Sequence, residues 1–515
     1  MPEGAFDIGI DRESAVADKQ NLSSDSGMPH LLLLALAAFL VGAFVTLAHK
    51  PFSQPEGGDE AIWDYVAQCI VRGQVPYRDV VEIKTPLSAY LSAGSMLIGR
   101  RAGLSDIVSV RLFNIVMAGL LSAVIFLVVV EYLRSRTAAC LAVLILFLPT
   151  HFSEWIVSGT EPKLPMILFG MLSVYFIARR KPFWSGLFSM LSCLCWQPGL
   201  MFTAVAFLIF SKYLTNWRDL GAARVLLGAA VPLAVLLIYF YSAGALSNLW
   251  LWTIVYNLKG YAPETAKSAR ETADLLSRVL IRVFKFDLIF VACSFTGFLW
   301  FVIERIKARR EHLGFKSQRF FVDAIVILPC IYIAFCWINF QSGPDLIPLF
   351  PFGSLYAAFF IAKLESLPLE EKLFRHLPAA SVAVLLIIIL FRIVNYRIYA
   401  AVTLPEQETQ IVSLSNTLSS TDTVFVHGAL EILVLLNRPN LNQYVDLRQG
   451  KDEFIAQRIP GGFTAFINQL EQSAPKIVAF SRAGRLHHRE ELREWITNHY
   501  DPLELAGFEG IYLRR

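Results

Sequence analysis

The stretch LLLLALAAFLVGAFVTLAH, residues 31–49, decides the fold class, because it contains no acidic residue, lysine or arginine. A helix needs about 20 consecutive apolar residues to cross a bilayer. The chain of 515 residues has the same character throughout, with 55% hydrophobic and 17% charged residues. Ordinary soluble domains carry about 25% charged residues. Much of the surface is therefore expected to face lipid, where charges are costly.

Further apolar runs of similar length predict a polytopic α-helical membrane protein with about eleven transmembrane helices. The run from Trp184 to Tyr213 is too long for one helix, and we divide it at Pro198-Gly199. The expected spans are approximately 31–49, 109–132, 138–152, 164–178, 183–197, 199–213, 224–243, 286–304, 320–340, 346–363 and 378–397.

The charges of the loops give an orientation. If the N-terminus is cytoplasmic, every loop predicted on that side is rich in Lys or Arg, as the positive-inside rule requires. These residues are Arg134, Arg136, Arg179, Arg180, Lys181, Lys212, Arg218, Arg224, Arg305, Lys307, Arg309, Arg310, Lys316, Arg319, Lys363, Lys372 and Arg375. The segments left outside are 50–108, 153–163, 244–285 and the chain from 398 onward. The net charge of +4 is small for this length and does not suggest nucleic-acid binding.

Two terminal segments differ from the helical region 29–397. Residues 1–28 are polar and are expected to be a disordered cytoplasmic tail. Residues 398–515 contain strand patterns at 422–428, 476–481 and 510–514, with helical patterns at 463–472 and 489–499 between them. Strands that alternate with helices predict a small soluble α/β domain on the periplasmic side.

The first outside loop holds the stretch GGDEAIWDYVAQCIVRGQVPYRDVVEIKTPL, residues 57–87. Ile62, Val66, Cys69 and Ile70 share one face of a helix, and Gly73 suits its C-terminal end. We expect this helix to lie along the membrane surface.

Two charged positions of this loop have a structural and a functional interpretation. Asp59 can cap the helix, with Glu60 in its first turn, or this acidic pair can supply a general base or metal ligands. Lys84 can be a lysine that extends to the membrane interface, or a point charge for a phosphate group.

The stretch resembles the first external loop of GT-C superfamily glycosyltransferases that use lipid-linked sugars. The similar branch includes protein O-mannosyltransferases, the bacterial aminoarabinose transferase and rhizobial lipopolysaccharide-core transferases. The matching pieces are Asp59-Glu60, Tyr65-Val66-Ala67-Gln68, Gly73–Asp79 and Lys84-Thr85-Pro86-Leu87. Thr85 departs from the usual Lys-Pro-Pro, and Trp196 replaces the lysine of a later Lys-Gln-Pro motif.

The resemblance implies a sugar transfer from a polyprenyl-phosphate donor to an envelope glycan, lipid or protein acceptor on the outer face of the membrane. Asp59 would be the general base with Glu60 beside it, and Lys84 would bind the donor phosphate. Arg111 is a second candidate for the phosphate, or an interfacial arginine. Tyr77, Asp79, Glu161 and Tyr256 are candidate substrate or acceptor contacts, although Glu161 can equally be an exposed loop carboxylate and Tyr256 part of an aromatic belt.

No cofactor is required by the sequence. A divalent metal ion is an option, and its ligands would come from Asp59, Glu60 and Glu161. The resemblance implies a bacterial inner membrane and lipopolysaccharide or another envelope glycan as its setting. The alternatives are a transporter or lipid flippase, which should carry its polar groups near the membrane midplane, and a non-catalytic scaffold protein.

Overall fold

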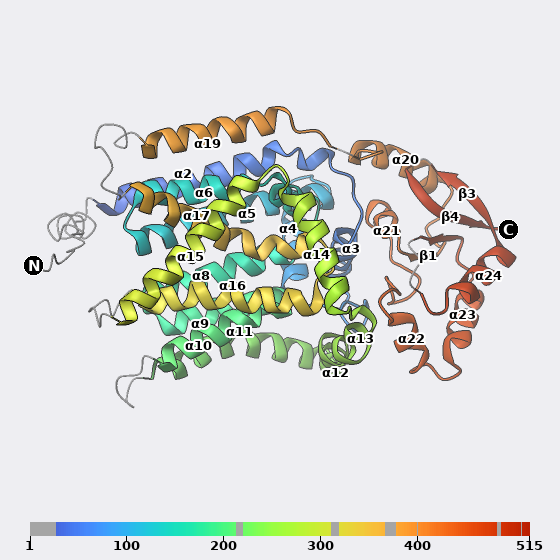
Figure 1. Cartoon of the computed structure of the whole chain (residues 1–515). Helices are drawn as coiled ribbons and strands as arrows, with labels where there is room; N and C mark the ends of the chain where they lie inside the picture. The colour runs from blue at the N-terminus through green and yellow to red at the C-terminus, as the bar shows by residue number, and fades with distance from the viewer. Residues whose placement is uncertain are drawn as a thin grey trace, which may run out of the picture.

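The apolar runs form helices that lie side by side in one bundle (Figure 1). The structure is a computed structural model, and it describes residues 27–515 except 213–219, 311–318, 366–376, 399, 482–485 and 506. Almost all of the predicted N-terminal tail and part of the predicted basic loops lie outside the described residues. The bundle helices are α2 (Gly27–Ala48), α5 (Asp106–Leu133), α6 (Arg136–Leu146), α8 (Lys163–Ala178), α9 (Pro182–Cys195), α10 (Leu200–Lys212), α11 (Gly221–Ser242), α15 (Leu288–Arg310), α16 (Arg319–Asn339), α17 (Phe350–Glu365) and α19 (Leu377–Val394).

Each predicted span contains one of these helices, and the division at Pro198-Gly199 is confirmed. There α9 ends at Cys195, and a short 3-10 turn, η2 (Gln197–Gly199), leads into α10. By length and composition, four helices of the described chain can cross a membrane. Two bent pairs raise this number to six: α6 with α7 (Thr150–Val157), bent by 66°, and α14 (Ala269–Phe284) with α15, bent by 115°. The chain is thus an integral membrane protein on the evidence of its helices.

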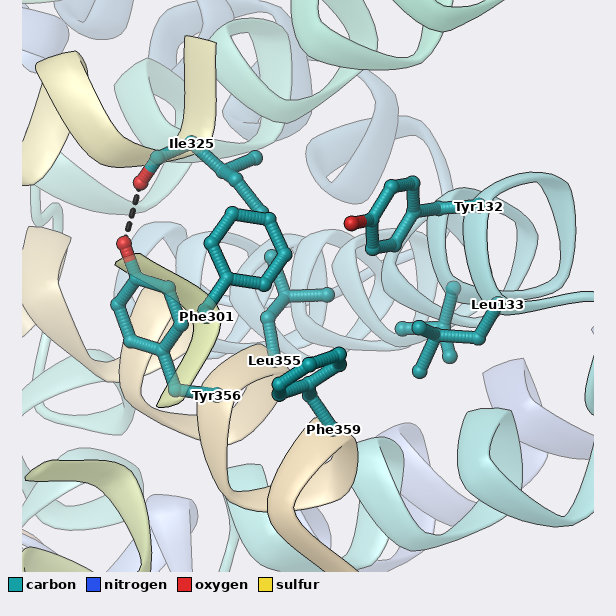
Figure 2. A pocket seen from close by; sticks show the side chains of 8 residues that line it. Tyr132, Leu133, Phe301, Ile325, Leu355, Tyr356 and Phe359 are labelled. Atoms are coloured by element: carbon teal, nitrogen blue, oxygen red, sulfur yellow. Dashed lines mark hydrogen bonds between the residues drawn. The ribbon is translucent and has the colours of Figure 1, made fainter. Parts of the chain in front are cut away.

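Helix α5 runs through the middle of the bundle and packs against α2, α6 and α8. A cavity of about 230 Å³ between α2, α6 and α19 is lined only by apolar side chains. The cavity in Figure 2 measures only about 10 Å³. It lies among Tyr132, Phe301, Leu355 and Phe359, and it offers room for about one water molecule at most. A site for a large polar substrate therefore has to be sought elsewhere.

Several shorter elements gather at one end of the bundle, on the right of Figure 1. They are η1 (Pro51–Ser53), α3 (Glu60–Val71), α4 (Leu87–Arg101), α12 (Leu246–Trp250), the π-helical turns η3 (Leu251–Val255) and η4 (Asn257–Tyr261), α13 (Ala262–Thr265) and the 3-10 turn η5 (Gly343–Leu349). The helix predicted after Asp59 is confirmed, and Gly73 follows its end with a φ of 85°. Every side chain from Ala61 to Cys69 is buried, so this helix is covered by other parts of the chain.

The last part of the chain forms a four-stranded sheet with helices around it. Its elements are α20 (Leu404–Asn416), β1 (Val424–His427), α21 (Glu431–Leu436), α22 (Lys451–Ala456), α23 (Gly462–Ser473), β2 (Ile477–Phe480), α24 (Arg489–His499), β3 (Tyr500–Leu505) and β4 (Phe508–Arg514). The strand order is β1-β2-β4-β3, with β1 and β2 parallel and the other pairs antiparallel. The sequence does not predict strand β3, because Pro502 and the acidic residues Asp501 and Glu504 hide its pattern; an edge strand tolerates proline.

The sheet region packs directly onto α3. The Tyr65 hydroxyl accepts a hydrogen bond from Asn440 N at 2.6 Å, and Gln68 Nε2 donates to Val434 O at 3.1 Å. Ala61, Val66 and Cys69 share one apolar cluster with β1, β2 and α21. Helix α3 is therefore enclosed between the bundle and the sheet.

Candidate active site

Two lysines and two tryptophans meet at the end of the bundle that faces the sheet. Lys84 Nζ lies 3.6 Å from the centre of a Trp63 ring, and Lys163 Nζ lies 5.8 Å from it. The distances to Trp196 are 5.6 Å for Lys84 and 5.0 Å for Lys163. Aromatic faces attract cations, so the indoles hold the two ammonium groups close together despite their repulsion. Two adjacent cations make a site for an anion.

Hydrogen bonds from several elements fix the backbone around Lys84. Glu82 Oε1 accepts from the backbone N–H of Lys84 at 2.9 Å, and the Tyr77 hydroxyl donates to Lys84 O at 2.6 Å. Gln197 Nε2 and Asn257 Nδ2 both donate to Ile83 O, at 2.7 and 2.9 Å. Lys84 is thus held by η2 and η4 as well as by its own loop.

Lys84 and Lys163 differ in their acidic partners. Lys163 Nζ lies 3.2 Å from Glu161 Oε1 and 3.9 Å from Asp345 Oδ1. Among the described residues, no carboxylate lies within 4 Å of Lys84 Nζ. Burial, followed by the nearby charge of Lys163, lowers the pKa of Lys84 to about 8. Lys84 is therefore the cation that lacks a counterion.

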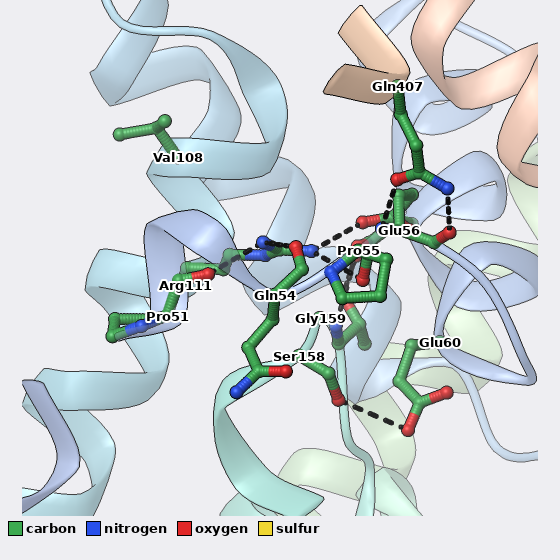
Figure 3. Close-up of polar contacts among 12 residues, drawn as sticks. Pro51, Gln54, Pro55, Glu56, Glu60, Val108, Arg111, Ser158, Gly159 and Gln407 are labelled. Carbon is green, nitrogen blue, oxygen red and sulfur yellow. Dashed lines mark hydrogen bonds and ion pairs between the residues drawn. The ribbon is translucent and has the colours of Figure 1, made fainter. Parts of the chain in front are cut away.

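The acidic pair at the start of α3 stands beside these lysines. Asp59 caps the helix by position only: its side chain makes no capping hydrogen bond, is 61% exposed, and lies 3.5 Å from Arg448 Nη2. Glu60 is partly buried and accepts a hydrogen bond from Ser158 Oγ at 3.3 Å (Figure 3). Burial, and then the charge of Glu161, raise the pKa of Glu60 to about 7. A carboxyl group with this pKa can take up and release a proton near neutral pH.

The loop that carries Glu161 is attached to α3, α4 and α5. Asp64, one turn after Glu60, accepts from Thr160 N at 3.1 Å and from the Thr160 hydroxyl. Thr160 Oγ1 lies 2.7 Å from Ser92 Oγ, and Asn114 Nδ2 donates to Gly159 O. These bonds place Glu161 and Lys163 next to Glu60 and Lys84.

The structure corrects the prediction for Arg111. Its side chain is fully buried, and its guanidinium donates to Pro51 O, Gln54 O, Pro55 O and Glu56 Oε2 (Figure 3). These acceptors belong to the segment before α3. Arg111 therefore fixes the entry to the site and has no free face for a phosphate.

Three other residues predicted to contact a substrate form hydrogen bonds with backbone atoms. Tyr77 is fully buried beneath Lys84, and Tyr256 is fully buried with its hydroxyl on Gln449 O at 2.6 Å. Asp79 accepts from Val75 N at 2.7 Å and pairs with Arg78. We correct these three from substrate contacts to residues that shape the loops. Glu161 is buried in an ion pair, so its interpretation as an exposed carboxylate is wrong.

Sequence reasoning missed four residues of the site. Trp63 lies within the quoted stretch 57–87, and Lys163 ends the second outside segment, but nothing in their spacing signals a shared anion site. Asp345 comes from η5, which is distant in the chain, and Arg448 from the sheet region. Only the fold brings these two close to the first loop. Among the described residues, no group of three or more His, Cys, Asp or Glu side chains is arranged to hold a metal ion.

Comparisons with known proteins agree with the predicted resemblance. Residues 73–238 match the family described as DolP-mannose mannosyltransferase. A dolichol phosphate-mannose mannosyltransferase of Haloferax volcanii is 28% identical over 217 residues, which cover 40% of this chain and 44% of that relative. The aligned part therefore spans less than half of the relative's length.

Solved structures show the same fold over almost the whole chain. The crystal structure of ArnT from Cupriavidus metallidurans bound to undecaprenyl phosphate has a TM-score of 0.63 at 12% identity, with coverage of 95% of this chain and 98% of that one. The apo state of that protein gives a TM-score of 0.61 at 13% identity. Taken together, the comparisons agree with the resemblance stated from residues 57–87: the sequence is similar to dolichol phosphate-mannose mannosyltransferases, and the fold is similar to that of ArnT.

Proposed function

We propose, from its place in the GT-C superfamily of glycosyltransferases, that this chain transfers a sugar from a polyprenyl-phosphate donor to an acceptor hydroxyl. The observation that carries the proposal is Lys84. It is a partly buried ammonium without a carboxylate partner among the described residues, held on Trp63 beside the acidic start of α3. Burying a cation without a counterion costs free energy, and an anion that binds next to it offsets this cost. A phosphate that enters and leaves with each turnover is such an anion.

The reaction assigns a task to each group. The acceptor oxygen attacks the anomeric carbon of the sugar, and Asp59 takes the hydroxyl proton as the bond forms. The bond between the anomeric carbon and the phosphate oxygen breaks, and the polyprenyl phosphate leaves with the electron pair. Lys84 stabilises the negative charge that grows on this leaving group. Glu60, with a pKa of about 7, is placed to accept the proton from Asp59 or to hold an acceptor hydroxyl.

The membrane arrangement follows from the same proposal. All eleven apolar helices would cross or enter the bilayer, with the basic loops in the cytoplasm and the sheet region outside as a separate α/β domain. The site would then lie at the outer surface, where the sheet region covers the bundle. The acceptor would be an envelope glycan, a lipid or a protein, and the membrane would be a bacterial or archaeal plasma membrane. The curated relative is archaeal.

The comparisons give no support to the transporter alternative. The charged residues of the site also argue against it, because they come from α3, its flanking loops and the starts of helices at one end of the bundle. A transporter would instead be expected to carry its polar groups near the middle of the spans.

Sugar release by the purified protein in detergent tests the proposal. The substrates are radiolabelled mannose and aminoarabinose on undecaprenyl phosphate and on dolichyl phosphate. We expect the wild type to release sugar from at least one donor. Asp59→Asn removes the base, and Lys84→Ala removes the charge on the leaving group, so each should lower the rate about 100-fold or more.

Lys285→Ala is the matched control, since Lys285 is an exposed lysine of an outer segment away from the site. Its rate should equal that of the wild type. If Lys84→Ala and Asp59→Asn keep the wild-type rate with every donor that turns over, the assignment of both residues is wrong. If no donor turns over while all variants bind undecaprenyl phosphate equally, the transferase proposal itself fails.

A further inference from the structure

The sheet region reaches into the site through one arginine. Arg448 lies between α21 and α22, and its Nη2 approaches Asp59 Oδ1 at 3.5 Å. Its Nε and Nη2 also bind Asp446, at 2.8 and 3.5 Å. Among the described residues, Nη1 has no hydrogen-bond partner. One N–H edge of the guanidinium therefore stays available next to the proposed base.

The loop around Arg448 contains a strained backbone conformation. Gln449 has a φ of 62° and Gly450 a φ of 74°, both in the left-handed region. A glutamine adopts this conformation only when its surroundings enforce it. Here Tyr256 donates to Gln449 O at 2.6 Å, and His427 Nδ1 accepts from Leu447 N at 3.1 Å. Two separate parts of the chain thus hold Arg448 in one position.

Two cations, Arg448 and Lys451, meet two carboxylates, Asp446 and Asp59. Asp446 is buried and is shared by two cations, because Lys451 Nζ also lies 3.0 Å from its Oδ2. His427 adds no positive charge, because burial lowers its pKa to about 4 and the ring is neutral at pH 7. The Arg448 side chain is 21% exposed, whereas that of Lys451 is 8% exposed. Arg448 is therefore the more accessible of the two cations.

We propose that Arg448 binds an anionic group of the acceptor, a phosphate or a carboxylate, and so places the acceptor hydroxyl beside Asp59. This inference rests on the proposed transferase function. Arginine suits the task because its planar N–H fork matches both groups. The donor phosphate is the second possible source of the same chemistry, but the proposed function already assigns Lys84 to it. Arg448 is thus a substrate-positioning residue that the sheet region contributes to the bundle.

Binding of ³²P-labelled inorganic phosphate tests the inference on the full-length protein, with the donor site first saturated with undecaprenyl phosphate. We expect the wild type to bind phosphate at a second site. Arg448→Ala should weaken this binding about 10-fold or more, and Arg448→Lys should restore part of it, since the charge returns without the fork. Arg493→Ala is the matched control, because Arg493 is an exposed arginine of the same region. It should bind phosphate as the wild type does.

A second measurement separates the two sources of the anion. The affinity for undecaprenyl phosphate should be unchanged within about twofold in Arg448→Ala and clearly reduced in Lys84→Ala. Equal losses in both variants would assign Arg448 to the donor and overturn the acceptor proposal. Absence of phosphate binding by the donor-saturated wild type would overturn it as well. Failure of sugar release from every donor would instead count against the transferase function, so the two failures can be told apart.

Discussion

At the scale of single residues, the charge of Lys84 determines how the enzyme should respond to pH. Its pKa is lowered to about 8 by burial and by Lys163, so the ammonium is charged below pH 8 and loses its charge above it. The donor phosphate needs this charge. We therefore expect kcat/KM for the donor to fall as the pH rises through about 8.

The Lys84→Arg variant tests whether Lys84 causes this fall of kcat/KM at alkaline pH. Arginine stays charged at any pH at which the protein is folded. In the variant, kcat/KM should therefore no longer fall above pH 8, even if the rate is lower at every pH. The measurement is kcat/KM for the donor between pH 6 and pH 10, which reports groups of the free enzyme. An identical fall of kcat/KM in the wild type and the variant would assign the titration to another group.

Gly159 is a residue whose small size the site requires. A Cβ added there would lie 2.7 Å from Asp64 Oδ2 and 2.9 Å from the Glu60 Cβ. Gly159→Ala should therefore displace α3 from the second outside loop, at a cost of about 1–3 kcal/mol, and should reduce sugar release. Thermal unfolding in detergent measures the first effect.

Gly94→Ala is the control, because nothing lies within 4 Å of the added carbon, and its unfolding temperature should not fall. A Gly159→Ala protein as stable as the wild type would show that the loop has room to move.

At the scale of elements, the junction between α3 and the second outside loop depends on Asp64. Its Oδ1 accepts from two donors of Thr160, and its Oδ2 lies in the interior without a hydrogen-bond partner. Burial raises the pKa of both Asp64 and its neighbour Glu56. A neutral side chain is consequently tolerated at position 64, provided that it still accepts hydrogen bonds.

The need for a hydrogen-bond acceptor at position 64 yields a prediction for two substitutions. Asp64→Ala leaves the Thr160 donors without an acceptor, at about 1–3 kcal/mol for each unsatisfied buried group. Amide hydrogen exchange in peptides that cover 158–163 should then become much faster. Asp64→Asn keeps the acceptor and should exchange nearly as slowly as the wild type. Equal exchange in the two variants would mean that the other attachments, to α4 and α5, suffice to hold the loop.

The elements also show which parts of the fold a sequence can predict. Apolar runs between basic loops were enough to locate the bundle helices, because lipid demands uninterrupted apolar stretches. The break of α6 before Pro149 and the sharp turn between α14 and α15 depend on tertiary packing, and the sequence did not reveal them. In the site, motif spacing predicted Asp59, Glu60 and Lys84. Arg111, Tyr77 and Tyr256 looked equally suitable, and only their burial distinguishes structural from chemical use.

At the scale of the whole molecule, the proposed orientation places the sheet region and the basic loop at Lys181 on opposite sides of the membrane. Lys181 and Glu509 are both exposed. In a Cys330→Ala background, which removes the exposed native cysteine, Glu509→Cys should react with a membrane-impermeant maleimide on intact cells. Lys181→Cys should react only after the cells are permeabilised. Labelling of both on intact cells would contradict an odd number of crossings between them.

The enclosure of α3 has a consequence for how the enzyme is made. Ala61 and Val66 reach their final surroundings only when Val424 and Ile477 pack against them, and ribosomes add about 5–20 residues per second. The first loop must therefore wait about 20–80 s after its own synthesis before it can close, because about 400 residues separate it from Ile477. During this interval Asp59 has no Arg448 beside it. Under the proposed function, a chain that ends before Arg448 would thus hold Asp59 and Lys84 but lack the arginine that positions the acceptor.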